Sequence, residues 1–231
     1  MDVAALVSAW EATLGQPVCR RATTLLEGAG TTDAARLDVG AREAKLLALH
    51  RRLAGDTLDG EATCAHCGER MDVTIPVTAL DAEPIGDAMV IEDDWRVELR
   101  VPTSDDVAWA LGEPDSEDAL LGRSVVRASR GDTVVAARDL PAGLRTLCES
   151  RLEAMAPLAN LSIGLSCPAC ARDDALPLDI GAFVLDKAAD WAHRQLVDVV
   201  TLCRAYGWSE QSVLAMSGWR RDFYLARLEE A

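Results

Sequence analysis

Two CxxC pairs constrain this chain more than any other feature of its sequence. Cys64 and Cys67 lie in the segment CAHCGER, and Cys167 and Cys170 lie in CPACARD. Each pair forms a tight turn that directs two thiolates to one point, and two such turns supply the four sulfurs of a tetrahedral zinc site. The total of seven cysteines is odd and no secretory signal precedes them, which argues against a framework of disulfides. The pattern predicts one structural Zn²⁺ per chain, bound by all four cysteines.

The residues around both pairs predict that each pair lies at the tip of a β-hairpin. Residues 71–75 and 176–180 have the alternating pattern of extended segments directly after the pairs. Gly68 follows the first pair, where a residue that tolerates positive φ is useful, whereas Ala171 follows the second. Ninety-nine residues separate the two pairs, so the predicted zinc ribbon is split by a long insertion.

Other roles for the cysteines stay open. A thioredoxin-like redox pair lies at the start of a helix, whereas strands are expected after both pairs here. His66 could replace one cysteine as a ligand, although a residue inside such a turn usually points away from the metal. Four thiolates leave no open coordination position, which argues against catalytic zinc. Redox or regulatory thiols, and a site without metal, are the remaining alternatives. Cys19, Cys148 and Cys203 lie in apolar helical contexts and are expected to be small core residues.

Hydrophobic periodicity predicts an α+β fold, mostly helical, with a split zinc-ribbon β module built on four cysteines. The expected units follow one another along the chain: N-terminal helices over 1–60, the first half of the zinc ribbon and an adjoining strand over 61–102, a helical insertion over 103–160, the second half of the ribbon over 161–181, and a C-terminal helical unit over 182–231. Individual helices are predicted over 3–14, 42–53, 117–128, 141–156 and 182–205, and a half-buried strand is predicted over 95–101.

The net charge of −15 is concentrated in one segment. Residues 81–118 hold thirteen acidic residues and two arginines. Such a segment is usually a solvated surface, and the sharper interpretation is a patch that docks a basic partner or repels nucleic acid. A strongly acidic chain is poorly suited to bind a phosphate backbone over a broad surface. The chain also lacks a long apolar run and a basic signal region, so no nucleic-acid or membrane contact is expected, and the expected location is cytoplasmic.

The C-terminal run carries a more specific pattern, in which AYGWSE is followed eight residues later by WRRDFYL. Three further segments accompany it in the same order: LDVGAREAKLLALHRRLAGD, VELRVPTSDDVAWAL, and CPAC followed by LPLDIGAFV. Together they resemble the baseplate hub assembly chaperone family of T-even-type contractile phages and related phage-tail-like injection systems. The resemblance implies an accessory protein of baseplate assembly, with hub or other baseplate proteins as partners and the paired cysteines as zinc ligands. Whether the protein stays in the finished particle does not follow from it.

No motif for catalysis accompanies these features. The sequence lacks a phosphate-binding loop, a strand-linked dinucleotide fingerprint, a zinc-protease motif and a serine-hydrolase elbow. We therefore expect a non-enzymatic protein, either an assembly chaperone or a minor component of the baseplate hub. The alternative is a zinc-ribbon adaptor that binds nucleic acid or a transcription-type partner.

More than half of the ten aromatic residues lie in the C-terminal unit, and three short helices cannot enclose all of their rings. Aromatic side chains beside arginine are typical of interaction hot spots. We expect a partner-binding surface formed by Trp208, Trp219, Arg220, Arg221 and Tyr224. The competing interpretation is that Trp208 and Trp219 only fasten the helices to the body of the protein.

Overall fold

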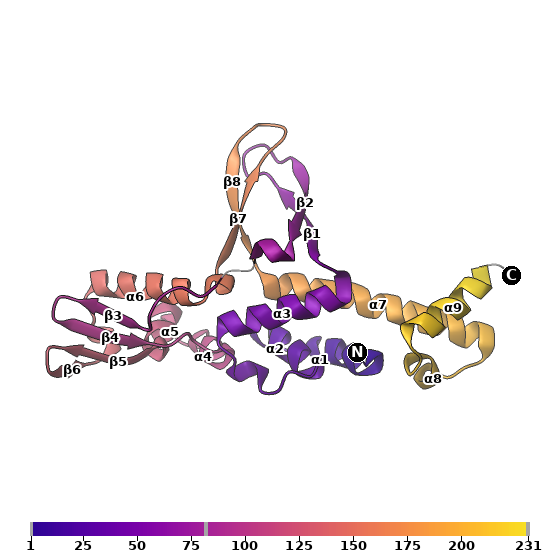
Figure 1. Cartoon of the computed structure of the whole chain (residues 1–231), viewed down its shortest axis with the longest axis horizontal. Helices are drawn as coiled ribbons and strands as arrows, with labels where there is room; N and C mark the ends of the chain where they lie inside the picture. Colours follow the sequence, from indigo (N-terminus) through magenta and orange to yellow (C-terminus); the bar gives the residue numbers. More distant parts are fainter. Residues whose placement is uncertain (1, 81–82, 230–231) are drawn as a thin grey trace.

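A body of packed helices lies at the centre of the computed structural model, which describes residues 2–80 and 83–229 (Figure 1). Its elements are α1 (Val3–Thr13), α2 (Val18–Gly28), the 3-10 helix η1 (Ala34–Arg36), α3 (Val39–Ala54) and the first part of α7 (Ile180–Tyr206). α3 begins where the Asp38 carboxylate accepts the Ala41 N–H at 2.8 Å, and it ends at Gly55, which has a φ of 95°. The helices share one apolar core, in which Leu25, Leu46 and Val184 are fully buried.

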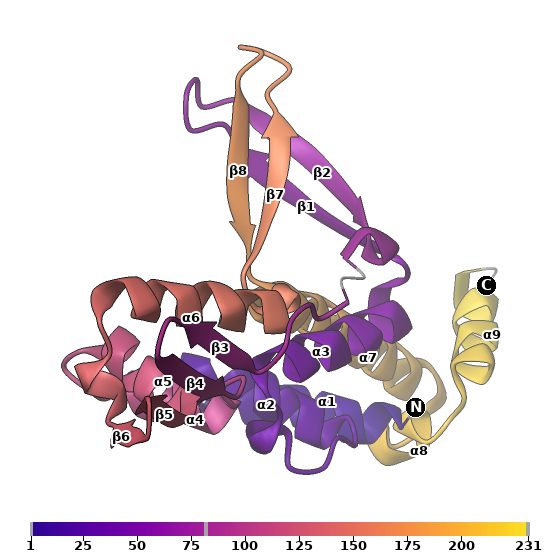
Figure 2. The same cartoon turned by 60° about the vertical axis from the view of Figure 1, so that its left-hand side comes forward.

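Two antiparallel hairpins project from this body and converge at their tips (Figures 1 and 2). The first pairs β1 (Thr57–Thr63) with β2 (Arg70–Pro76), and the second pairs β7 (Leu161–Ser166) with β8 (Asp173–Leu178). The hairpins form two separate two-stranded sheets, and apolar side chains from both line a cavity of about 130 Å³ between them. Both CxxC pairs lie at hairpin tips, which confirms that prediction. The short helix η2 (Val77–Leu80) follows the first hairpin.

The segment between the hairpins forms a unit of its own with a separate core. Four antiparallel strands occur in the order β3 (Met89–Glu92), β4 (Trp95–Leu99), β5 (Val125–Arg130) and β6 (Thr133–Val135). The accompanying helices are α4 (Ser104–Ala110), α5 (Ser116–Ser124), η3 (Ala137–Asp139), α6 (Ala142–Met155) and η4 (Pro157–Ala159). Val97 and Ala128 of the sheet share a core with Leu144 and Cys148 of α6. We call this part the inserted unit.

The inserted unit differs from the purely helical segment expected over 103–160. The helix predicted over 117–128 ends at Ser124, and Val125 begins a strand. The reason is pairing with β4: Val97 lies opposite Ala128, and both side chains are buried. Valine is β-branched and fits a paired strand better than a helix end, so tertiary pairing outweighs the local apolar spacing. The predicted strand over 95–101 exists as β4, but it belongs to this sheet rather than to either hairpin.

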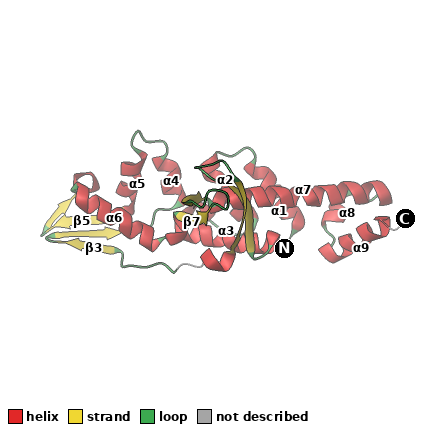
Figure 3. Cartoon of the chain, turned by 90° about the horizontal axis from the view of Figure 1, so that it is seen from above, coloured by secondary structure: helices red, strands yellow, loops and turns green. Residues whose placement is uncertain are grey.

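A small third core closes the far end of α7 (Figure 3). Gly207, with a φ of 69°, ends α7, and the Ser209 hydroxyl caps α8 (Glu210–Leu214) by accepting the Ser212 N–H. α9 (Gly218–Glu229) then folds back toward α7, and Val199 and Val213 are buried between the helices. The helix predicted over 182–205 is confirmed as α7, which begins at Ile180 and ends at Tyr206. None of the helices in the described ranges is both long and apolar enough to span a membrane.

The buried carboxylate of Asp106 joins three segments within the inserted unit. It accepts hydrogen bonds from Arg100 at 2.6 Å, from Arg123 at 2.8 Å, and from the N–H and hydroxyl of Thr103, both at 2.9 Å. Thr103 in turn accepts the Asp106 N–H, which completes a capping box at the start of α4. These contacts, led by the Arg100 hydrogen bond, hold the pKa of Asp106 well below its usual range.

We expect Asp106→Asn to lower the free energy of unfolding by about 2 kcal/mol, because Arg100 and Arg123 lose their buried anion. Both arginines are partly exposed, so solvent screening keeps the loss below that of a fully buried pair. Asp105→Asn is the matched control, since Asp105 and its partner Arg20 are both partly exposed. Its expected cost is at most about 0.5 kcal/mol in urea denaturation at pH 7.

The stability difference between wild type and Asp106→Asn should also depend on pH. A folded-state pKa below the unfolded value of about 4 stabilises the native state above that pH, and the stabilisation is lost as the pH falls through the folded pKa. The difference should therefore shrink below about pH 4. A difference that stays constant from pH 7 down to acid would contradict the ion-pair account.

Candidate metal centre and partner surface

The sulfurs of all four CxxC cysteines meet where the hairpin tips converge. They lie within 4.8 Å of one another, with 3.7 Å between Cys64 and Cys170 and 3.6 Å between Cys67 and Cys167. A tetrahedral site with metal–sulfur bonds of about 2.3 Å has sulfur–sulfur edges of about 3.8 Å. The predicted grouping is confirmed, and its spacing fits a four-coordinate metal ion.

The two turns that carry the cysteines share the same backbone hydrogen bonds. In the first turn the Cys64 N–H donates to the Glu69 carbonyl at 2.8 Å, and the Gly68 N–H donates to the Cys64 carbonyl at 3.0 Å. The second turn repeats both bonds at 2.9 and 2.8 Å. In each pair the first cysteine, Cys64 or Cys167, is buried and the second is more exposed. The two hairpins thus present equivalent halves of one site.

Each turn needs a positive φ after its second cysteine, and only the first has a glycine there. The φ is 76° at Gly68 and 55° at Ala171. An L-residue with a side chain costs about 1 kcal/mol or more in this region. We therefore expect Ala171→Gly to raise the free energy of unfolding by about 1 kcal/mol, and Gly68→Ala to lower it by a similar amount.

Chemical denaturation of the metal-loaded protein measures both substitutions. Beyond the adjoining residues, no atom lies within 4 Å of a Cβ placed at Gly68, so the loss there reports backbone strain rather than a clash. Shifts of opposite sign are expected for the two substitutions. A destabilising Ala171→Gly would contradict the equivalence of the turns.

Backbone N–H groups and neighbouring sulfurs set the acidity of the cysteines. The N–H of His66, followed by that of Cys67, lowers the pKa of Cys64 to about 6. The pKa of Cys67 is raised to about 12: the Glu69 N–H is the largest single influence and lowers it, but Cys167, burial and the other sulfurs together outweigh that effect. The backbone around Cys64 thus favours its thiolate, whereas burial and the neighbouring sulfurs oppose ionisation of Cys67. A divalent cation would relieve the repulsion among four thiolates, so the donor set fits a thiophilic divalent ion.

His66 takes no part in the sulfur cluster. Its exposed ring lies with Nδ1 3.2 Å from a guanidinium nitrogen of Arg172, on the other hairpin. The group of side chains that could hold a metal ion consists of the four cysteines alone among the residues that the structure describes. The imidazole therefore contributes a contact between the hairpins.

The five residues predicted to bind partners have two different environments. Trp208 and Tyr224 pack into the third core, with their rings 4.8 Å apart in an edge-to-face arrangement. Arg221 is only 4% exposed and is attracted to Asp198 on α7. Arg221 therefore offers no surface to a partner, contrary to the expectation, because α9 turns this position toward α7.

Trp219 and Arg220 are exposed and belong to a longer surface on α9. Trp219 is 75% exposed, and Phe223, one turn along, is 45% exposed with its ring stacked 6.0 Å away. The Arg227 guanidinium lies 5.3 Å from the centre of the Phe223 ring. We call Trp219, Arg220, Phe223 and Arg227 the α9 stripe. The prediction from sequence omitted Phe223, although its spacing of four residues from Trp219 is the signal that places both on one helix face.

One model of a known protein family matches a large part of this chain. The model described as T4 bacteriophage base plate protein matches residues 23–183. Among curated proteins and solved structures, none matches the chain. The matched range contains the inserted unit, both hairpins and all four clustered cysteines, and it stops before α8 and α9. The hub assembly chaperone assignment, which rests largely on the C-terminal run, stays a prediction. Since the match covers more than half of its length, the chain belongs to the family of T4 bacteriophage base plate proteins.

Proposed function

We propose that this chain is a non-enzymatic accessory protein for the baseplate hub of a contractile phage tail or a phage-tail-like injection system. It acts as an assembly chaperone or as a minor component, and it folds around one structural Zn²⁺. The match of residues 23–183 to the base plate family is the observation that carries the proposal. The matched range includes the whole metal-bearing part of the fold.

Zinc is proposed because four thiolates at tetrahedral spacing are its usual structural ligand set. Protein sulfur would occupy every coordination position, so the ion would have no place for a reacting water or substrate. The two hairpins are not hydrogen-bonded into one sheet, and a shared ion would join them at their tips. These features support a structural rather than a catalytic role.

Recognition of other baseplate proteins is assigned to exposed surfaces, of which the α9 stripe is the first candidate. Its pair of exposed aromatic rings beside arginine has the composition of a binding hot spot. The alternative function, a zinc-ribbon adaptor for nucleic acid, is disfavoured by the net charge of −15.

Deletion of the gene from a phage or injection-system cluster tests the proposed role. We expect electron micrographs to show tubes and sheaths without finished baseplates, and expression in trans to restore them. Normal particles from the deletion strain would contradict the proposal. Mass spectrometry of purified finished particles then separates the two forms of the role, since a component is present and a chaperone is absent.

Binding to labelled DNA and RNA across a salt series tests the adaptor function. The proposal expects no binding at any salt concentration. Tight binding that weakens steeply with salt would favour the adaptor instead.

A further inference from the structure

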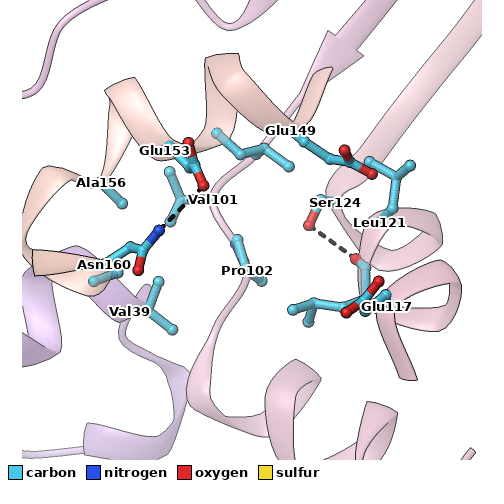
Figure 4. A pocket seen from close by; sticks show the side chains of 13 residues that line it. Val39, Val101, Pro102, Glu117, Leu121, Ser124, Glu149, Glu153, Ala156 and Asn160 are labelled. Carbon is cyan, nitrogen blue, oxygen red and sulfur yellow. Dashed lines mark hydrogen bonds between the residues drawn. The ribbon is translucent and has the colours of Figure 1, made fainter. Parts of the chain in front are cut away.

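A pocket of about 400 Å³ lies where the inserted unit meets the helical body (Figure 4). Its walls come from four places in the chain: Val39 at the start of α3, Pro102 before α4, Leu121 on α5 and Leu152 on α6. A backbone hydrogen bond joins two of these segments, since the Val39 N–H donates to the Pro102 carbonyl at 3.0 Å. The pocket is therefore a preformed apolar depression between two cores.

Three exposed glutamates surround this apolar depression. Glu149 and Glu153 extend from α6, and Glu117 extends from α5 on the opposite side (Figure 4). Glu153 accepts a hydrogen bond from Asn160 at 3.1 Å. Within residues 2–80 and 83–229, no basic side chain forms an ion pair with any of the three. Carboxylates without a basic partner around an apolar floor favour an occupant with an apolar group and adjacent positive charge.

The α9 stripe has the complementary chemistry. Trp219 and Phe223 present exposed rings, and Arg220 and Arg227 place positive charge beside them. The stripe lies at the opposite end of the long axis from α5 and α6, so it cannot reach the pocket of its own chain (Figures 1 and 3). A pocket that receives such a stripe must therefore belong to another molecule.

We infer that the acid-rimmed pocket receives the α9 stripe of a second copy of this chain. An aromatic ring would cover the apolar floor, and Arg220 would lie beside the glutamates. This inference rests on the part of the proposed function that makes α9 a recognition surface. The two surfaces differ, so the contact is heterologous: each docking event leaves one pocket and one stripe free, and copies join head to tail into a ring or an open chain.

The net charge of −15 on each copy opposes association, so the contact should be of about micromolar strength. Sedimentation velocity of the purified wild type should therefore show association that grows with concentration. High salt weakens both the attraction of Arg220 to the glutamates and the repulsion between the copies, so variants rather than salt provide the decisive test.

Two variants, each lacking one surface, test the inference by mixing. The pocket variant carries Glu149→Lys and Glu153→Lys, and the stripe variant carries Trp219→Ala and Arg220→Glu. Neither should associate with itself, but the mixture contains one intact stripe and one intact pocket and should form a 1:1 complex. A control with Glu11→Lys and Glu27→Lys makes the same charge change on exposed positions elsewhere and should associate like wild type or more strongly.

A mixture that stays monomeric, or a single variant that still self-associates, would overturn the inference. If the lysine pocket variant does not fold, Glu149→Gln with Glu153→Gln replaces it; this variant should weaken wild-type self-association about tenfold, and an unchanged association would equally overturn the inference. A monomeric mixture combined with binding of baseplate proteins that still depends on Trp219 would overturn docking to a second copy and leave the proposed function standing.

Discussion

Replacement of Cys167 by serine is expected to reduce the zinc content of the purified protein from one ion per chain to near zero. The substitution removes one of the four sulfurs that lie within 4.8 Å of one another, and a neutral serine hydroxyl is a poor zinc ligand. Cys19→Ser is the matched control, because Cys19 lies outside the cluster, and it should retain a full ion. Elemental analysis measures both proteins. Equal zinc content in Cys167→Ser and wild type would contradict the four-thiolate site.

The same substitution should destabilise the hairpins far more than the rest of the chain. The free energy of binding a structural zinc ion contributes to the free energy of folding, and it amounts to about 10–16 kcal/mol in zinc-finger peptides at neutral pH. Here the body and the inserted unit keep separate apolar cores, so the loss should be confined to the two hairpins. Hydrogen exchange should show lost protection in β1, β2, β7 and β8, with α3 and α6 still protected. Uniform loss across the chain would mean that metal supports the whole fold.

A double substitution of Trp219 and Arg220 by alanine is expected to abolish co-purification with baseplate proteins at unchanged melting temperature and zinc content. Trp219 is 75% exposed, so its removal costs little packing, whereas loss of a hot-spot aromatic and its neighbouring cation weakens binding by about 2 kcal/mol or more, roughly thirtyfold. Pull-down with co-expressed baseplate proteins measures the effect.

Trp208→Ala is the contrasting variant for this experiment. The Trp208 ring stacks on Tyr206 at 4.6 Å and packs against Tyr224, so its loss should lower the stability of the C-terminal unit. Retained co-purification by the Trp219 and Arg220 variant would remove α9 from the recognition surface. Unfolding of that variant would mean that these side chains are scaffold, and the acidic segment would become the next candidate.

The cluster of four cysteines could be predicted from sequence because the requirement for it is chemical and largely independent of the path of the chain. Two CxxC pairs can supply four ligands to one tetrahedral ion whether the pairs are close or distant in sequence, and the strands that follow each pair have a local alternating pattern. The positive φ after the first pair could likewise be predicted from Gly68, whereas Ala171 gave no sign of the positive φ at the equivalent position of the second pair. These signals lie within a few residues of the features they predict.

The sheet of the inserted unit and the pocket depend on partners far along the chain, so local patterns did not reveal them. The local sequence around Val125 fits the end of a helix. Val125 instead begins β5, because β5 pairs with β4. The burial of Arg221 depends on the rotation of α9 against α7, which the spacing within α9 does not fix. The pocket walls come from four segments, so no single stretch of sequence contains its pattern. In each case tertiary contacts decide between conformations that the local sequence allows equally well.

The separation of the two halves of the metal centre has a consequence for synthesis of the chain. Cys67 and Cys167 are 100 positions apart, so a ribosome adding about 5–20 residues per second makes the second half about 5–20 s after the first. During that interval the nascent chain contains Cys64 and Cys67 without the other two cysteines, and their thiols can be oxidised. Because the inserted unit has its own core, we expect it to fold during this interval and to bring the ends of the intervening segment together before the second hairpin emerges. Binding of the proposed ion would then require a chain that has been synthesised and folded through Cys170.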